Sequence, residues 1–387
     1  MIDIRETLQL KTLLSIAKRI VKRDTLVDFR EELKNSGYNF DETILDFNLL
    51  RSAFSFILDG GVKREIKRVF MPGFICPVMA EVVKRSNKEL VLVDSDLQTF
   101  NMDFDFVTKF GVGKNDAILI NHTFGNPVSI KTLLKIPQNN RPLIISDNAL
   151  ALFSEIDGGY AGVGADLIML NLHKQFANTD GALVIGNELL KNDYDVIKKD
   201  SGIYKNFTDV VLKTGGIHQN LINLIRSIMP LYKEVSAKIS RWSVKRMSKF
   251  GGLVFRESLG NLKNEIEKRR ELAILYDKLL PLKYFVPQKI EEGHSFANYA
   301  VRLKPEYKAL RDRMVADLRS EGIFVDRMWY NSPTGKDYKK FIPQTLNNTK
   351  ILAKTVINLP IRGDYSKQDV KYLFRAIDKI LKNYSCE

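Results

Sequence analysis

The sequence has few cysteines, no long hydrophobic run and no short repeat, and each shortage excludes a class of protein. Its two cysteines, Cys76 and Cys386, are too few for a disulfide framework, and the sequence shows no zinc-finger spacing. No apolar run has the length of a membrane span, and the N-terminus lacks the apolar core of a signal peptide. We therefore expect a cytoplasmic protein without a membrane span or a bound metal.

The charge of the chain is unbalanced towards the positive. Sixty Lys and Arg residues against 46 Asp and Glu residues leave a net charge of +14, which favours anionic partners such as phosphorylated small molecules. The basic residues are spread through the chain without an RNA-binding signature, so we expect no nucleic-acid partner. Residues 10–23, "LKTLLSIAKRIVKR", favour a packed helix with a basic outer face over a helix lying on a membrane.

Short apolar runs at regular intervals predict the fold class. Runs such as "ELVLVD" (89–94), "DAILIN" (116–121) and "PLIISD" (142–147) alternate with helical segments, which indicates a mostly parallel sheet covered on both faces. A second α+β unit follows, with strands predicted at "NYAVRLK" (298–304), "IFVDRMWY" (323–330) and "TVINLPI" (355–361). We predict an N-terminal helical segment (1–45), a large α/β domain (46–250) and a smaller C-terminal α+β domain (251–387).

Two polar residues follow strands of the predicted sheet, where ligands of such sheets bind. Asp147 ends one apolar run, and Lys174 lies three residues beyond the next, in "NLHKQFANTDGALV" (171–184). A solvated loop lysine and an Asp that caps a helix are the plain interpretations. The alternative is a pyridoxal phosphate site, in which a lysine forms a Schiff base and a carboxylate keeps the pyridine nitrogen protonated.

An ordered series of motifs decides between these interpretations, because it resembles the DegT/DnrJ/EryC1/StrS family. That family consists of pyridoxal-phosphate sugar aminotransferases with the aspartate aminotransferase fold, called fold type I. The resemblance covers about residues 45 to 380. The motifs are "RSAFSFIL" (51–58), "MPGFICPVMAEVVK" (71–84), "ILINHTFGNP" (118–127), "IISDNALAL" (144–152), "NLHKQFANTDGALV" (171–184), "RMWYNSP" (327–333) and "INLPI" (357–361).

The resemblance assigns roles to individual residues. It implies that Lys174 is the Schiff-base lysine and that Asp147 holds the pyridine nitrogen. The family usually has Ser-Gly-Thr or Ser-Gly-Arg at the phosphate, where this chain has Leu49-Leu50-Arg51, so Arg51 and Ser52 would bind the phosphate instead. The remaining residues implied at the cofactor are Phe74, Cys76, Asn171, which replaces a serine, and Leu150, which replaces a Gln or His; Val244 stands where the family has a partner-subunit asparagine.

The resemblance also implies a reaction. We expect a homodimeric aminotransferase that moves an amino group, from glutamate as amino-acid donor, to a keto sugar carried on a nucleotide, in surface polysaccharide or antibiotic sugar synthesis. Two alternatives stay open. One is a pyridoxal-phosphate-dependent dehydratase or another lyase. The other is a catalytically silent binding member of the fold, which the changed phosphate turn and Leu150 support.

Overall fold

The computed structural model describes residues 2–3, 10–22, 26–176, 180–190, 194–198, 242–342 and 345–385. The chain divides into two compact units, which are described separately. Unit 1 comprises Met1–Arg5, Arg64–Ile168 and Asn261–Glu387, and unit 2 comprises Glu6–Lys63 and Met169–Gly260. The predicted domains follow a different division and remain a prediction.

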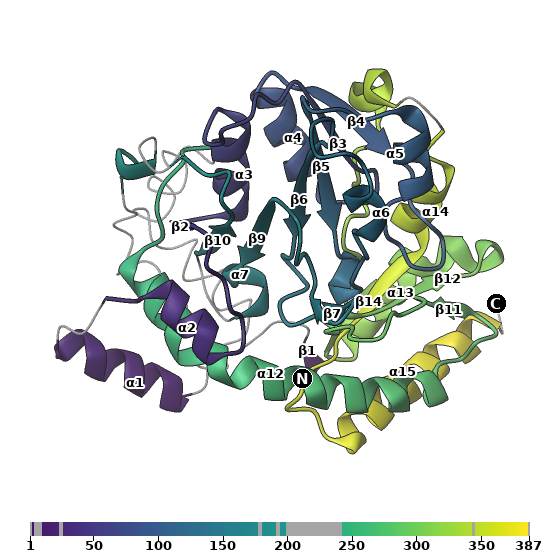
Figure 1. Cartoon of the computed structure of the whole chain (residues 1–387). Coiled ribbons are helices and arrows are strands. Elements are labelled where there is room, and N and C mark those ends of the chain that lie inside the picture. Colours follow the sequence, from purple (N-terminus) through teal and green to yellow (C-terminus); the bar gives the residue numbers. More distant parts are fainter. Residues whose placement is uncertain are drawn as a thin grey trace, which may run out of the picture. The chain divides into compact units, whose positions relative to one another are not determined.

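The main sheet is mostly parallel, as the sequence predicts, and the structure confirms an α/β fold (Figure 1). Its strand order is β2-β10-β9-β6-β5-β3-β4. Within unit 1, β6, β5, β3 and β4 pair in parallel, while in unit 2 β2 and β10 pair antiparallel. The strands are β2 (Ile44–Phe47), β3 (Arg68–Pro72), β4 (Glu89–Val93), β5 (Asp116–Asn121), β6 (Leu143–Asp147), β9 (Leu167–Asn171) and β10 (Ala182–Ile185).

Both faces of the central strands are covered, because every residue of β5 and β6 is buried. Helices α5 (Phe104–Phe110) and α6 (Lys131–Leu134) cover one face, where Val107 and Leu133 pack with Phe70, Ile118 and Ile144. Helix α4 (Pro77–Arg85) begins with a proline, whose missing N–H costs nothing at a helix start, and joins β3 to β4. The burial explains why these strands are continuous apolar runs.

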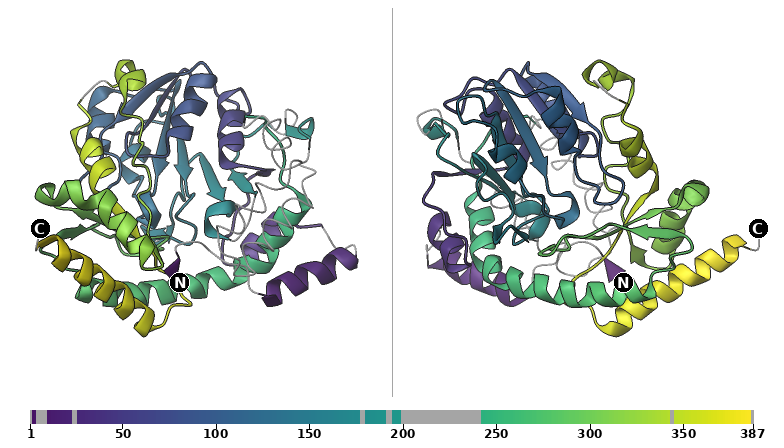
Figure 2. Two further views of the ribbon diagram at one scale, coloured as in Figure 1. Left: turned by 180° about the vertical axis from the view of Figure 1, so that it is seen from behind. Right: turned by 45° about the vertical axis from the view of Figure 1, so that its right-hand side comes forward.

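The C-terminal part of unit 1 forms the predicted α+β layer. Its antiparallel sheet packs against helices α12 (Lys249–Leu279) and α15 (Lys367–Ser385). Tyr276 of α12 contacts Tyr299 and Phe374. Figure 2 shows α15 running alongside α12. A serine directly before the apolar pattern of residues 367–383 predicts a helix cap at Ser366, and its Oγ accepts from Asp369 N at 3.2 Å. The elements are β11 (Phe285–Pro287), β12 (Tyr299–Leu303), η2 (Pro305–Leu310), α13 (Arg311–Ser320), η3 (Lys336–Phe341), α14 (Asn347–Thr355), β14 (Val356–Leu359) and α15 (Lys367–Ser385).

The strand predicted at 323–330 is wrong beyond its first two residues. Strand β13 (Ile323–Phe324) pairs with β1 (Ile2–Asp3), and only a single bridge at Asp326 follows before the chain turns. Trp329 has a φ of 60°, which no strand residue adopts. The composition of residues 323–330 is typical of a strand. The indole of Trp329, however, packs against Phe74 and Phe124, and this packing overrides the β propensity of the segment.

Unit 2 contains the N-terminal helices and the start of the longest helix. The run "SLGNLKNEIEKRRELAILYDKLL" (258–280) predicts a long amphipathic helix, and helix α12 (Lys249–Leu279) begins before it and includes Gly251. A side-chain carbon at Gly251 would collide with Asp180, so glycine permits a close approach there. Other elements are α1 (Leu10–Val21), α2 (Phe29–Asn35), α3 (Leu50–Leu58) and α7 (Leu172–Gln175); elsewhere, unit 1 has the hairpin β7 (Glu155–Ile156) and β8 (Gly159–Tyr160) and the turn η1 (Thr123–Gly125).

The basic segment at 190–245, which we predict to be partly helical, lies largely outside the described residues. Among the helices that are described, none combines the length and the apolar character needed to cross a bilayer. The described residues also contain no group of three His, Cys, Asp or Glu side chains arranged to hold a metal ion.

Candidate active site

The candidate acid, Asp147, is the last residue of β6 and is only 2 % exposed. Its Oδ1 accepts a hydrogen bond from Ala149 N at 3.0 Å, and its Oδ2 accepts one from Asn121 Nδ2 at 3.3 Å. No Lys or Arg of the described part of unit 1 pairs with this carboxylate. Burial raises the pKa of Asp147 from its ordinary 3.8 to about 6, although the two hydrogen bonds oppose the rise.

Asn121, which ends β5, holds Asp147 in a fixed orientation. Its Nδ2 donates to the carboxylate, and its Oδ1 lies 3.2 Å from Thr123 Oγ1, a hydroxyl that is equally close to Phe100 O. Thr123 is fixed in turn, since its backbone N donates to Asn101 Oδ1 at 2.9 Å. The sequence signal that points to Asn121 is its place at the end of a strand.

A separate buried network positions the backbone around Asp147. His122 Nδ1 accepts from Val128 N at 3.0 Å, so Nε2 carries the proton and donates to Ser146 Oγ at 2.8 Å. Ser146 then donates to Asn148 Oδ1 at 2.6 Å. Complete burial lowers the pKa of His122 to about 3, so its imidazole stays neutral. His122 thus holds the backbone at the strand end through Val128 and Ser146.

An aromatic cluster lies beyond the strand ends of unit 1. Phe124 stacks on Trp329 with centroids 4.8 Å apart, and Phe74 meets both rings edge-on. Leu150, three residues after Asp147, is 5 % exposed and belongs to this cluster. Phe100, Phe124 and Trp329 all have φ between 60° and 64°, a conformation that costs about 1–3 kcal/mol for a residue with a side chain. Such strain gathers at functional sites.

The loop that carries Phe74 and Cys76 is tied to the C-terminal layer. Tyr338 donates to Glu81 of α4 at 2.6 Å. The Ser332 hydroxyl donates to Trp329 O at 2.7 Å, and its Oγ lies 3.5 Å from Ile75 O. Cys76 is half-buried and forms no disulfide within the described part of the chain. The segment 329–338 therefore supports the same loop that the family resemblance places at the cofactor ring.

The candidate lysine lies in unit 2. Lys174 belongs to the one-turn helix α7, directly after β9, and is exposed. No ion pair or hydrogen bond engages its ammonium among the described residues of unit 2. Gly181 fixes the start of α7: its carbonyl accepts from Leu172 N at 3.0 Å, and its N donates to Asn48 O at 2.6 Å. Asn171, at the end of β9, is half-buried.

The two candidate phosphate ligands begin α3 in unit 2. Leu49 caps this helix without a side-chain hydrogen bond, Arg51 is half-buried, and Ser52 is buried with its Oγ donating to Ser243 O at 3.5 Å. The N-terminus of a helix carries partial positive charge, which suits a phosphate. Asn48, just before the helix, has a buried Oδ1 without a partner in the described chain.

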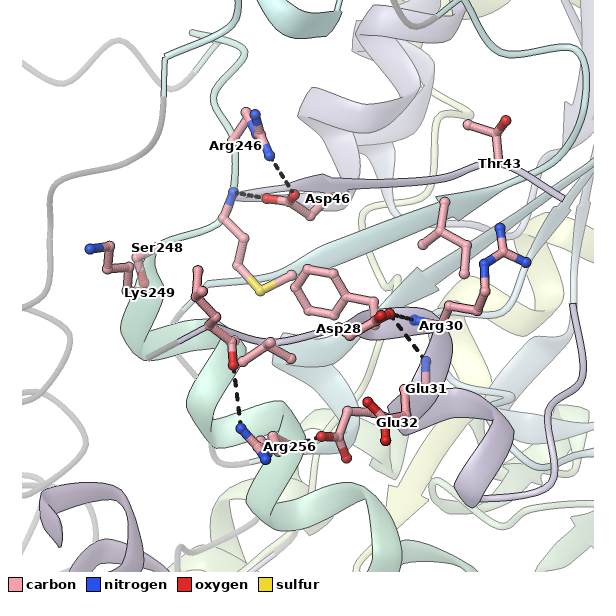
Figure 3. A pocket seen from close by; sticks show the side chains of 16 residues that line it. Asp28, Arg30, Glu31, Glu32, Thr43, Asp46, Arg246, Ser248, Lys249 and Arg256 are labelled. Carbon is pink, nitrogen blue, oxygen red and sulfur yellow. Dashed lines mark hydrogen bonds and ion pairs between the residues drawn. The ribbon is translucent and has the colours of Figure 1, made fainter. Parts of the chain in front are cut away.

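Figure 3 shows a separate cavity of about 640 Å³ in unit 2, which none of the predicted site residues lines. Several of its polar groups pair with one another. Arg246 Nη2 lies 3.3 Å from Asp46 Oδ1, Asp46 Oδ2 accepts from Met247 N at 2.9 Å, and Arg256 forms an ion pair with Glu32 at 3.0 Å. Arg246, two residues after Val244, is therefore engaged within its own chain.

The sequence profile of the DegT/DnrJ/EryC1/StrS aminotransferase family matches residues 60–378. The chain belongs to this family. A transaminase of UDP-4-amino-4,6-dideoxy-N-acetyl-β-L-altrosamine from Campylobacter jejuni is 24 % identical over 272 residues, which span 67 % of this chain and 65 % of the relative. A dTDP-4-amino-4,6-dideoxy-D-glucose transaminase from Shigella dysenteriae is 24 % identical over 276 residues, 69 % of this chain and 67 % of the relative.

The comparison of structures covers more of the chain than the comparison of sequences. Helicobacter pylori PseC, an aminotransferase of pseudoaminic acid biosynthesis, superposes with a TM-score of 0.74 at 14 % identity and covers 99 % of both chains. An identity this low shows the fold alone. The superposition confirms the fold-type-I architecture that the family resemblance implies, with a mostly parallel sheet and a smaller α+β layer.

Proposed function

We propose that the protein is a pyridoxal-phosphate-dependent aminotransferase that moves an amino group from glutamate to a keto sugar carried on a nucleotide. Family membership supports the reaction, and the names of the two relatives support the substrate class. One observation carries the cofactor assignment: Asp147 is a buried carboxylate without a cation in its own unit among the described residues. A protonated pyridine nitrogen would supply that cation.

Two residues would perform the chemistry. Lys174 would bond the cofactor aldehyde through its amine, and its exposure leaves the amine within reach of substrates. Asp147 would keep the pyridine nitrogen protonated. When bound, the cofactor supplies an electron sink for the charge that remains when the substrate carbon loses its proton. Lys174, released by the incoming amino donor, would remove that proton as a base and return it as an acid.

Three further residues would hold the phosphate group. Arg51 would contribute a cation and Ser52 a hydroxyl at the start of α3, and the amide of Asn171 would donate a hydrogen bond. These three replace the glycine-containing turn and the serine that the family usually has. Ser52 Oγ faces Ser243 O at 3.5 Å, a weak contact that a phosphate oxygen would outcompete.

Three residues of unit 1 would form the surroundings of the cofactor ring. Phe74 and Leu150 belong to one apolar cluster, and Cys76 follows Phe74 in the loop. Leu150 cannot donate the hydrogen bond that a Gln or His at this position would donate. The ring would therefore be held by apolar contact on this side and by Asp147 at its nitrogen.

The assembly and the substrate charge complete the proposal. A two-fold homodimer is proposed, in which each subunit would contribute to both sites. The net charge of +14 suits a substrate that carries a pyrophosphate.

The test is to trap the cofactor covalently on the purified full chain. Protein mixed with pyridoxal phosphate should turn yellow, and borohydride reduction followed by peptide mass spectrometry should place the adduct on Lys174. Lys174→Arg keeps the charge but cannot bond the aldehyde, so it should lose the adduct. Lys308→Arg, which changes another exposed lysine, is the matched control and should keep it.

Adding L-glutamate tests the reaction itself. The parent protein should lose its yellow colour as the aminated cofactor forms, and a nucleotide-linked keto sugar should restore it. A chain that remains colourless with excess pyridoxal phosphate would show that the protein is a silent binding member of the family. A chain that binds the cofactor but ignores amino donors would favour a lyase.

A further inference from the structure

Asn121 lies opposite Asp147 in the sheet of unit 1. Strands β5 and β6 run side by side in parallel, and their register pairs Asn121 with Asp147 as the last residue of each strand (Figure 1). Paired residues of neighbouring strands point to the same face of a sheet, so the two side chains are neighbours. Asn121 is 3 % exposed and Asp147 is 2 % exposed. Bulk water therefore cannot replace either partner of this pair.

The carboxylate of Asp147 has one side-chain donor among the described residues of unit 1, and that donor is Asn121. Its Nδ2 donates to Oδ2 at 3.3 Å. The second donor is a backbone group, since Ala149 N donates to Oδ1 at 3.0 Å. A backbone donor is present whatever side chain occupies its position. Asn121 is therefore the donor that an amino-acid substitution can remove.

Charged groups do not take over this task in the described part of unit 1. No cation or anion there contributes to the pKa of Asp147, which burial raises and the two hydrogen bonds lower. His122, the titratable residue beside Asn121, directs its ring nitrogens to Val128 and Ser146. Two neutral donors thus oppose the cost of burying the carboxylate.

The groups on both sides of the Asn121 amide determine its orientation. Turning the amide over would place Oδ1 against the ionised carboxylate, and two acceptors would then face each other without a proton. On its other side, Oδ1 lies 3.2 Å from the hydroxyl of Thr123. Thr123 is itself held, because its N donates to Asn101 Oδ1 at 2.9 Å and its O accepts from Gln288 Nε2 at 3.1 Å. The donor is therefore aimed at Asp147 before any ligand binds.

We propose that Asn121 is a positioning residue of the proposed cofactor site, which holds the carboxylate of Asp147 ionised and in place for the pyridine nitrogen. Pairing with a protonated nitrogen requires the ionised form, and a hydrogen bond to a charged group favours that form. This role rests on the proposed function, since it requires that Asp147 faces a cofactor. Asn121 would act through Asp147 and would not touch the substrate.

Loss of the Asn121 donor should move the ionisation of Asp147 towards higher pH. One hydrogen bond to a charged group changes a proton affinity about tenfold, which corresponds to about one pH unit. The pKa of Asp147 is about 6 in the parent, so ionisation in Asn121→Val should be half complete at about pH 7. Valine suits a strand and has no side-chain donor. A purely structural role of Asn121 would instead lower stability equally at every pH.

Urea unfolding of the full chain measures this shift in the absence of the cofactor. At each pH from 5 to 9, the free energy of unfolding of the parent is compared with that of Asp147→Asn, and that of Asn121→Val with that of the double variant. Both differences grow as Asp147 ionises, and the second should level off about one pH unit above the first. Asn139→Val makes the same substitution at an exposed position and should give the parental profile.

Binding of pyridoxal phosphate measures the consequence for the site. At pH 6 it should bind Asn121→Val about fivefold more weakly than the parent, since about half of the parent carboxylates but roughly one tenth of the variant carboxylates are ionised. At pH 9 both carboxylates are ionised, and the two proteins should bind it alike. Asn121→Ala, which adds no volume, replaces Asn121→Val with the same expectations if the valine variant does not fold.

The role of Asn121 is refuted if the two stability differences level off at the same pH, or if the ratio of the two affinities is the same at pH 6 and pH 9. A parent chain that binds no pyridoxal phosphate would refute the proposed function and this role with it. A parent chain that binds the cofactor, together with an Asn121→Val variant that binds it equally well at pH 6, would refute the role of Asn121 alone.

Discussion

Replacement of Asp147 by asparagine should have opposite effects on the cofactor-free and the cofactor-bound protein. In the cofactor-free chain, burial of the carboxylate raises the pKa of Asp147 from 3.8 to about 6. The folded state then binds the proton more tightly than the unfolded chain does, so ionisation of Asp147 opposes folding. This penalty is absent below pH 3.8, grows as the pH rises and is complete above pH 6.

The magnitude follows from the size of the pKa change. Each tenfold change in proton affinity is worth about 1.4 kcal/mol, so the penalty is about 3 kcal/mol at pH 8 and roughly half of that at pH 5. Asparagine removes the charge but has one carbonyl oxygen for two donors, Ala149 N and Asn121 Nδ2. One donor loses its acceptor, which costs about 1–2 kcal/mol. Asp147→Asn should therefore stabilise the cofactor-free protein by about 1–2 kcal/mol at pH 8 and hardly at all at pH 5.

Urea unfolding at both pH values measures this difference, with Asp41→Asn as a control at an exposed carboxylate. Saturating pyridoxal phosphate should reverse the sign at pH 8. The parent protein gains stability from a cofactor that Asp147 pairs with, whereas Asp147→Asn should gain far less. The reasoning fails if the variant is equally destabilised at pH 8 and pH 5, since Asp147 would then be an ordinary hydrogen-bonding residue.

Three further substitutions test the surroundings of Asp147. Ser146→Ala leaves the buried Nε2–H of His122 without an acceptor and should lower the free energy of unfolding by about 2–3 kcal/mol in urea titrations. Because the pKa of His122 is lowered in the folded state, neutral His122 contributes fully to the free energy of unfolding above pH 6.5, and this contribution is lost as the pH falls. The parent protein should therefore lose about 2 kcal/mol of its free energy of unfolding between pH 7 and pH 5 that His122→Asn does not lose. Trp329→Ala should cost about 1–3 kcal/mol through the stack on Phe124, and Trp329→Gly should cost about 1 kcal/mol less, because glycine adopts the φ of 60° freely; equal losses in thermal unfolding would contradict this strain.

The sequence predicts those parts of the site that depend on local pattern. The apolar runs ending at Asp147 and Asn171 are strands β6 and β9 with the same C-terminal residues. A strand that is buried on both faces has a continuous apolar run in its own sequence, so it can be predicted without knowledge of its neighbours. Ser366 is the cap of α15 for a similar reason, since capping is a local hydrogen bond.

Features that depend on contacts between residues far apart in the chain cannot be predicted from the sequence pattern. Trp329 reads as a strand residue, yet stacking on Phe124, some 200 residues away, gives it a left-handed conformation. The helical pattern predicts a start at residue 258, yet α12 starts at Lys249 and includes Gly251, where Asp180 packs against the helix. Periodicity carries no information about such pairs.

The environments of the two candidate catalytic groups differ in the way that their proposed tasks require. An acid that only has to stay ionised beside a nitrogen can be buried, and Asp147 is buried. A lysine that must meet an aldehyde, an amino donor and a keto sugar in turn has to be reachable, and Lys174 is exposed. Exposure alone also fits a solvated surface lysine, and pyridoxal phosphate modifies exposed lysines without selection. The decisive quantity is therefore the ratio of trapped cofactor on Lys174 to that on Lys308 at limiting cofactor. A ratio near one would leave Lys174 an ordinary surface residue, whereas strong preference, lost in Asp147→Asn, would show that the two groups serve one cofactor.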